Sequence, residues 1–177
     1  RGMGVVAADV NLDGHMDLYV ANDLCPNFLF LGRGDGTFRD VTDICGAALD
    51  ASGRALSGMG VDAEDINEDG LPDLFVTNFW MQNNTLYQNI GRELFVDMSE
   101  PSGLAAASRR AVGWGTRIQD LNNDGLPDIF VANGHVDNNM IDFGIDAPYR
   151  QSAQVWCNVG QGRFEHVSDN SSPYFGT

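Results

Sequence analysis

The sequence has 177 residues, 43% of them hydrophobic, which suits a folded chain with a packed core rather than a disordered one. Its 25 acidic residues outnumber 10 basic residues, and the formal charge of −15 would repel nucleic-acid phosphates and anionic membrane surfaces. No apolar run approaches the roughly 18 residues that cross a bilayer. We therefore expect neither nucleic-acid binding nor membrane insertion.

The first unit, residues 1–56, is predicted to hold four short strands. They fall at residues 2–4, 18–20, 29–32 and 38–41. These runs are rich in Val, Leu, Phe and Tyr, and turn residues of the Gly, Asn and Asp type separate them. No stretch of the chain sustains a helical period.

The second unit, residues 57–110, and the third, residues 111–177, repeat this order with a period of about 55 residues. The matching strands lie at residues 58–60, 74–76, 86–89 and 95–98, and at residues 113–115, 129–131, 155–158 and 164–167. The third unit carries an insertion at residues 134–152. Long loops on rigid scaffolds often carry binding sites, so this loop is a candidate partner surface; a solvated insertion packed only on its own unit is the alternative.

Four-stranded units in tandem predict an all-β fold of β-propeller blades stacked sheet against sheet. A β-solenoid is the alternative, but its repeats are usually much shorter. Three units do not close a ring of roughly four to eight blades. We therefore expect an incomplete propeller, completed by sequence outside this chain or by neighbouring copies stacked head to tail into a ring or fibre.

Each unit contains one Asp-x-Asn-x-Asp-Gly-x-x-Asp loop between its first two predicted strands. Calcium takes about 6–8 oxygen ligands, which alternate residues of such a loop can supply, and Gly14 permits the bend. The absence of His or Cys side chains among the ligands disfavours zinc and copper. The sequence thus predicts three Ca²⁺ sites. Their ligands are Asp9, Asn11, Asp13, the carbonyl of His15 and Asp17; Asp65, Asn67, Asp69, the carbonyl of Leu71 and Asp73; and Asp120, Asn122, Asp124, the carbonyl of Leu126 and Asp128.

Two other interpretations of the loops fit less well. An EF-hand requires Glu at the twelfth position and flanking helices, whereas Val20, Val76 and Val131 stand there inside strand-like runs. A plain Asp-Asn-Gly hairpin turn explains one loop but not three copies that retain all four side-chain positions. Without a cation, the clustered carboxylates should repel one another and loosen each loop.

Three cysteines, Cys25, Cys45 and Cys157, lack the spacing of a zinc site. Two alternatives remain for them. Either Cys25 and Cys45 form a disulfide within the first unit and leave Cys157 as a buried thiol, or all three are free buried thiols.

At the three Asp loops the sequence resembles the FG-GAP or VCBS repeats of integrin α-subunit propellers and many secreted bacterial proteins. Residues 113–116, 130–136 and 149–151 look more specifically like the repeats of the cartilage acidic protein and ASPIC/UnbV group. The resemblance implies calcium loops between the first two strands of each blade and a secreted or surface location. It implies no particular activity, because propellers serve binding, adhesion and catalysis alike.

We expect an extracellular, calcium-stabilised structural and interaction module that binds a protein or glycan, as in cell adhesion. A self-assembling surface or fibre subunit is the alternative. Part of a polysaccharide-acting enzyme is less favoured, because His15, His135 and His166 stand beside no recognisable nucleophile motif. We therefore expect no catalytic residues and no cofactor besides calcium. Possible N-glycosylation sequences at Asn83 and Asn170 agree with secretion.

Overall fold

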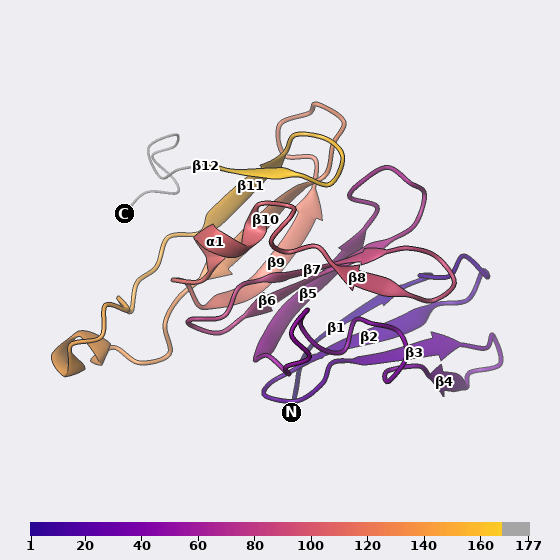
Figure 1. Ribbon diagram of the computed structural model, residues 1–177, viewed down its shortest axis with the longest axis horizontal. Helices are drawn as coiled ribbons and strands as arrows, with labels where there is room; N and C mark the ends of the chain where they lie inside the picture. The colour runs from indigo at the N-terminus through magenta and orange to yellow at the C-terminus, as the bar shows by residue number, and fades with distance from the viewer. Residues whose placement is uncertain (168–177) are drawn as a thin grey trace.

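The computed structural model describes residues 1–167, which form three four-stranded antiparallel sheets, one in each repeat unit (Figure 1). The bounds are β1 (Gly2–Ala8), β2 (Asp17–Asn22), β3 (Phe28–Gly32) and β4 (Phe38–Asp40) in the first sheet; β5 (Gly58–Glu64), β6 (Asp73–Asn78), β7 (Thr85–Asn89) and β8 (Phe95–Asp97) in the second; and β9 (Gly113–Gln119), β10 (Asp128–Asn133), β11 (Gln154–Asn158) and β12 (Phe164–Val167) in the third.

The strand order in each sheet follows the chain, so every strand pairs with its sequence neighbour. The registers correspond as well, with Leu18 opposite Phe30 in the first sheet and Leu74 opposite Tyr87 in the second. The predicted strands and the all-β class are thus confirmed. The sheets lie inside the three predicted units, whose outer boundaries stay predictions.

The sheets meet at their first strands. In Figure 1, β1, β5 and β9 run side by side, while β4 and β12 lie toward the rim. A Cβ added to Gly4 would lie 2.2 Å from the carbonyl oxygen of Met59, and one added to Gly60 would lie 1.9 Å from that of Trp114. Glycine is therefore required at Gly4 and Gly60, where neighbouring inner strands approach, which explains the second glycine of the Gly-x-Gly segment in the first two units. Successive sheets packed at their inner strands are the arrangement of propeller blades.

Two hydrophobic clusters fill the spaces between successive sheets. Tyr19 and Leu29 of the first sheet pack with Leu74 of the second, and Phe75 packs with Trp156 of the third. Alternate residues of β6 enter opposite clusters, because successive side chains of a strand point to opposite faces. All six residues of β6 are consequently buried.

A short helix, α1 (Leu104–Ser108), was not expected from the sequence. It spans only five residues, too few for a helical period to be visible in the pattern. Its Leu104 and Ala105 are fully buried, and it contacts β7 and β12. Burial in tertiary contacts therefore stabilises a segment that could not be stable as an isolated helix.

The three cysteines are free, so the Cys25–Cys45 disulfide is absent from the structure. Cys45 is buried, whereas Cys25 and Cys157 are partly exposed, so the expectation of a buried Cys157 is also wrong. Burial raises the pKa of the Cys45 thiol. The thiol lies 3.5 Å from the carbonyl oxygen of Thr42, which can accept its hydrogen bond.

The insertion at residues 134–152 extends from the third sheet as the long orange loop of Figure 1. It includes a 3₁₀ turn, η1 (Met140–Phe143), and its base is joined by a 3.0 Å hydrogen bond from the amide of His135 to the carbonyl of Tyr149. Within residues 1–167, no helix is long and apolar enough to cross a bilayer. The possible glycosylation site at Asn170 lies outside the described residues.

Candidate functional sites

The first Asp loop is held by hydrogen bonds between its own side chains and backbone. The two carboxylate oxygens of Asp9 accept from the amides of Asp13 and Gly14, at 3.0 and 2.8 Å. The Asn11 side-chain oxygen also accepts from the amide of Asp13, and Asp13 accepts from the amide of His15 at 2.9 Å. Three oxygen-bearing side chains are therefore oriented within one turn.

The second and third loops repeat this geometry. Asp65 accepts from the amides of Asp69 and Gly70, and Asp120 from those of Asp124 and Gly125. The corresponding asparagine and second carboxylate make the same bonds in each loop. The glycines Gly14, Gly70 and Gly125 share positive φ values of 87°, 88° and 93°. Three stretches of differing sequence thus adopt one conformation.

The last carboxylate of each loop has a different environment. Asp17 is 1% exposed and accepts from the amides of Val10 and Gly32, at 2.9 and 2.8 Å. Asp73 and Asp128 make the equivalent pairs of bonds, to Ile66 and Asn89 and to Leu121 and Asn158. Each carboxylate therefore joins its loop to the third strand of the same sheet.

Burial raises the pKa of two of these carboxyl groups. It raises the pKa of Asp17, and it raises that of Asp73 to about 7, although two backbone amides oppose the shift in each case. A buried carboxylate without a cation is costly, because the charged form loses its hydration. A cation bound beside Asp73 would lower that cost.

Within residues 1–167, no three Asp, Glu, His or Cys side chains gather as a group that could hold a metal ion. Partly exposed Asp9, exposed Asp13 and buried Asp17 thus border one loop without gathering into such a group. The chemistry of the donors still suits calcium. An ionised carboxylate offers about four lone-pair sites, and the two amides bound to Asp17 use only half of them.

One buried asparagine connects each of the first two loops to the following sheet, a contact that was not predicted from the sequence. Asn89 at the end of β7 donates to the carbonyl of Val10 in the first loop, at 2.8 Å, and also to that of Pro72. Asn158 at the end of β11 repeats this with Ile66 in the second loop, at 2.9 Å. Both are buried. Their matching positions in the repeat were visible, but their partners in another unit were not.

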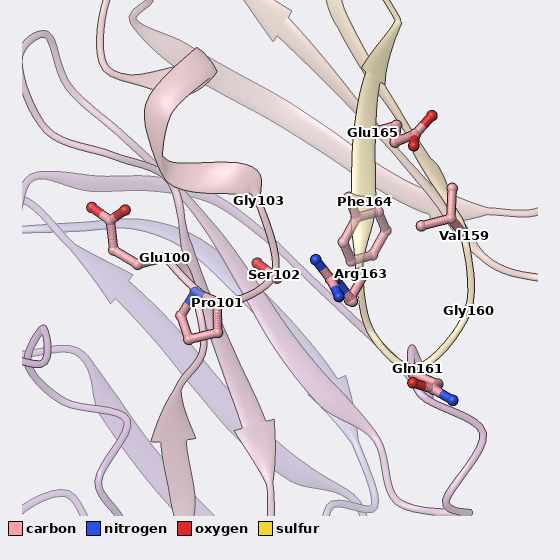
Figure 2. Close-up of a pocket in the computed structure, with 10 residues that line it drawn as sticks. All are labelled: Glu100, Pro101, Ser102, Gly103, Val159, Gly160, Gln161, Arg163, Phe164 and Glu165. Atoms are coloured by element: carbon pink, nitrogen blue, oxygen red, sulfur yellow. The ribbon is translucent and has the colours of Figure 1, made fainter.

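A depression of about 660 Å³ lies between residues 100–103 and residues 159–165 (Figure 2). Its walls are joined by a 2.8 Å hydrogen bond from the amide of Phe164 to the carbonyl of Ser102. The Ser102 hydroxyl donates to the carbonyl of Ser99, and Glu100 forms an ion pair with Arg109. Of these bonds, the one between Phe164 and Ser102 joins two units, and the other two lie within the second unit.

A second depression, about 580 Å³, lies at the base of the insertion in the third unit. Its lining includes Trp114 of β9, Asn133 of β10, and His135 and Gln151 from the two ends of the loop. Phe79 and Trp80 of the second unit stack near the His135 ring, with centroids 5.7 and 6.0 Å away. The insertion is thus anchored against a neighbouring unit as well as its own.

Comparison with known proteins agrees with the repeated loops and sheets. The profile of the FG-GAP-like repeat matches residues 9–76 and 65–131, which together cover more than half of the chain. The chain belongs to the FG-GAP-like repeat family. Each matched range starts at the first Asp of one loop and ends on the second strand of the next sheet.

Relatives of this FG-GAP-like repeat protein include cartilage acidic protein 1 from Homo sapiens, 32% identical over 135 residues, and from Mus musculus, 30% identical over the same length. The match covers 75% of this chain but only 19% and 20% of those proteins. A solved structure of an Agrocybe aegerita lectin is 20% identical and aligns with 92% of this chain and 50% of its own, with a TM-score of 0.39.

Proposed function

We propose that this FG-GAP-like repeat protein is an extracellular binding module, in which each Asp loop binds one calcium ion and the blade surface engages a protein or glycan. The observation that carries the calcium assignment is the identical conformation of three acidic loops. Three copies of a turn that orients Asp, Asn and Asp oxygens favour a shared ligand over chance turn chemistry.

The ligands in this proposal are the side chains and carbonyls predicted from the sequence. In the first loop these are Asp9, Asn11 and Asp13, the carbonyl of His15, and a free lone pair of Asp17. Calcium would offset the repulsion among the carboxylates and the lost hydration of the buried one. It would also offset part of the excess negative charge.

Calcium binding would also support the contact between sheets. The carbonyls that accept from Asn89 and Asn158 belong to Val10 and Ile66, which directly follow the first Asp of their loops. An ion that fixes the loop therefore fixes the acceptor on which the next sheet docks. Binding free energy would then appear as folding free energy.

Chelation tests this proposal. We expect excess EDTA to lower the melting temperature measured by circular dichroism, and excess Ca²⁺ to restore it, with Mg²⁺ at the same concentration restoring less because it demands stricter octahedral geometry. An identical melting curve in EDTA and in Ca²⁺ would rule out calcium as a stabilising ligand.

Self-association is a second candidate, favoured by apolar side chains on the inner strand β1. Met3 is 54% exposed and Val5 64%, both beside the depression that Met59 and Trp114 line at the inner strands. Static light scattering in Ca²⁺ would distinguish assemblies from a monomer of 19.2 kDa. A monodisperse monomer at high concentration would exclude this alternative.

A further inference from the structure

The depression at the base of the insertion combines polar atoms that lack partners with exposed aromatic surface. Four atoms within residues 1–167 are buried side-chain nitrogens or oxygens without a hydrogen-bond partner, and three of them belong to residues that line this depression. They are the side-chain oxygen of Asn133, Nε2 of His135 and the side-chain nitrogen of Gln151. Buried polar groups are usually paired, so their concentration in one place indicates a binding site.

The His135 ring has a fixed tautomer. Its Nδ1 lies 3.1 Å from the amide of Asp137 and accepts that N–H, so the proton of the neutral ring is on Nε2. The residue is 4% exposed and packs beside Phe79 and Trp80. Nε2 is therefore a donor held in place by the ring packing, without an acceptor among the described residues.

The side-chain amides of Asn133 and Gln151 are each hydrogen-bonded through only one of their two polar atoms. Asn133 donates through its nitrogen to the carbonyl of Ser152 and to Gln154, at 2.9 and 3.1 Å, which leaves its oxygen as an acceptor. The Gln151 side-chain oxygen accepts from the amide of Val112 at 2.8 Å, which leaves its nitrogen as a donor. Three residues that line the depression thus carry two donors and one acceptor without a partner among residues 1–167.

Aromatic side chains border the same depression. The indole of Trp114 is fixed by a 2.7 Å hydrogen bond from Nε1 to the carbonyl of Gly134. Tyr149 is 53% exposed and lines the rim. Such rings offer a flat apolar surface with a polar group at one edge, which suits a ligand that is itself part apolar and part hydroxylated.

We propose that this depression binds a neutral saccharide. Each sugar hydroxyl both donates and accepts, so adjacent hydroxyls can satisfy the Asn133 acceptor and the donors of His135 and Gln151. The C–H faces of the ring would lie on Tyr149 or Trp114. Arg150 also lines the depression and is a further donor for a sugar hydroxyl, while the charge of −15 on the whole chain disfavours an anionic sugar. This assignment rests on the proposed binding function and specifies its ligand class and location.

Saturation-transfer NMR on the whole chain in Ca²⁺ tests the site. The probes are methyl β-glucoside, methyl β-galactoside and N-acetylglucosamine, with N-acetylneuraminic acid as the anionic comparison. We expect transfer to at least one neutral probe and a weaker signal from the acid. Tyr149→Ala, which removes the exposed ring, and Gln151→Glu, which keeps the acceptor for Val112 but loses the donor, should each weaken binding about tenfold.

Phe143→Ala is the matched control, because Phe143 is an exposed aromatic residue of the same insertion that does not line the depression. It should bind as the unaltered chain does. Absence of transfer to every neutral probe, preference for the acid, or equal binding by Tyr149→Ala would each overturn the saccharide site. A melting temperature lowered by EDTA, together with no saccharide binding, would overturn the saccharide site but not the calcium proposal. Saccharide binding together with a melting temperature unchanged by EDTA would overturn the calcium proposal but not the saccharide site.

Discussion

The side-chain nitrogen of Asn89 in the second sheet lies 2.8 Å from the carbonyl oxygen of Val10 in the first Asp loop. The bond is buried and joins residues 79 positions apart in the sequence. The equivalent bond of Asn158 to Ile66 joins the third sheet to the second loop. The Asp loops are therefore contact points between units as well as turns within them.

We expect Asn89→Ala and Asn158→Ala each to lower the free energy of unfolding by about 1–3 kcal/mol, because buried carbonyls lose their donor. Urea denaturation followed by fluorescence would measure the change. Asn138→Ala is a suitable control, since Asn138 is exposed, and it should be neutral within about 0.5 kcal/mol. If Asn89→Ala and Asn158→Ala lowered the free energy of unfolding no more than the control does, these bonds would contribute little to stability.

Removing one carboxylate should remove one ion. Asp13→Ala, Asp69→Ala and Asp124→Ala are each expected to reduce calcium stoichiometry by about one in isothermal titration calorimetry. The first two variants should also lower the melting temperature in Ca²⁺ more than the third. Loops one and two support a following sheet through Val10 and Ile66, while the described residues show no such contact for Leu121 of loop three. An equal fall in melting temperature in all three variants would contradict the link between the first two loops and the sheets that follow them.

Replacing an inner-strand glycine with alanine should change the stability of the protein by an amount that depends on the unit, as Gly60 and Gly115 show. Gly60→Ala would place a Cβ 1.9 Å from the carbonyl oxygen of Trp114, and we expect a loss of at least about 1–3 kcal/mol. Gly115, the counterpart in the third unit, has no atom within 4 Å of an added Cβ. Gly115→Ala should therefore leave the melting temperature nearly unchanged. Similar melting of both variants would disprove the close approach of the inner strands.

The thiols should be reactive according to their burial. Ellman's reagent should label Cys25 and, more slowly, Cys157 in the folded protein, because burial and nearby carboxylates raise the pKa of the Cys157 thiol. Cys45 should react only after denaturation, because it is buried and its thiol pKa is also raised. Intact mass should not change on reduction. A gain of about two mass units on reduction would instead reveal one disulfide.

The strand pattern was predictable because each unit repeats the same short apolar runs and turn residues. The position of the Asp loops between the first and second strands was also correctly predicted. The sequence could not show that Asp17 and its counterparts would be buried against backbone amides, because their partners, such as Gly32, come from a later strand. Nor could it show why the predicted strands need glycine at Gly4 and Gly60, since the neighbouring carbonyls belong to other units.

The insertion, residues 134–152, was also only partly predictable from the sequence. Its length was visible in the sequence and suggested a binding surface. The hydrogen bonds that leave Asn133, His135 and Gln151 with free groups depend on Asp137, Ser152 and Val112. The pairing of Gln151 with Val112 arises only when the end of the loop packs beside the start of β9, whereas Asp137 and Ser152 belong to the loop itself.

The asparagine bonds give the array of units a direction. A unit offers a loop carbonyl to the unit after it and extends an asparagine to the unit before it, as the second unit does through Ile66 and Asn89. Transplanting or duplicating a unit would therefore preserve docking only when both features face matching neighbours. A unit inserted in an array could carry a perfect metal loop and still interrupt the stack if it lacked that one amide.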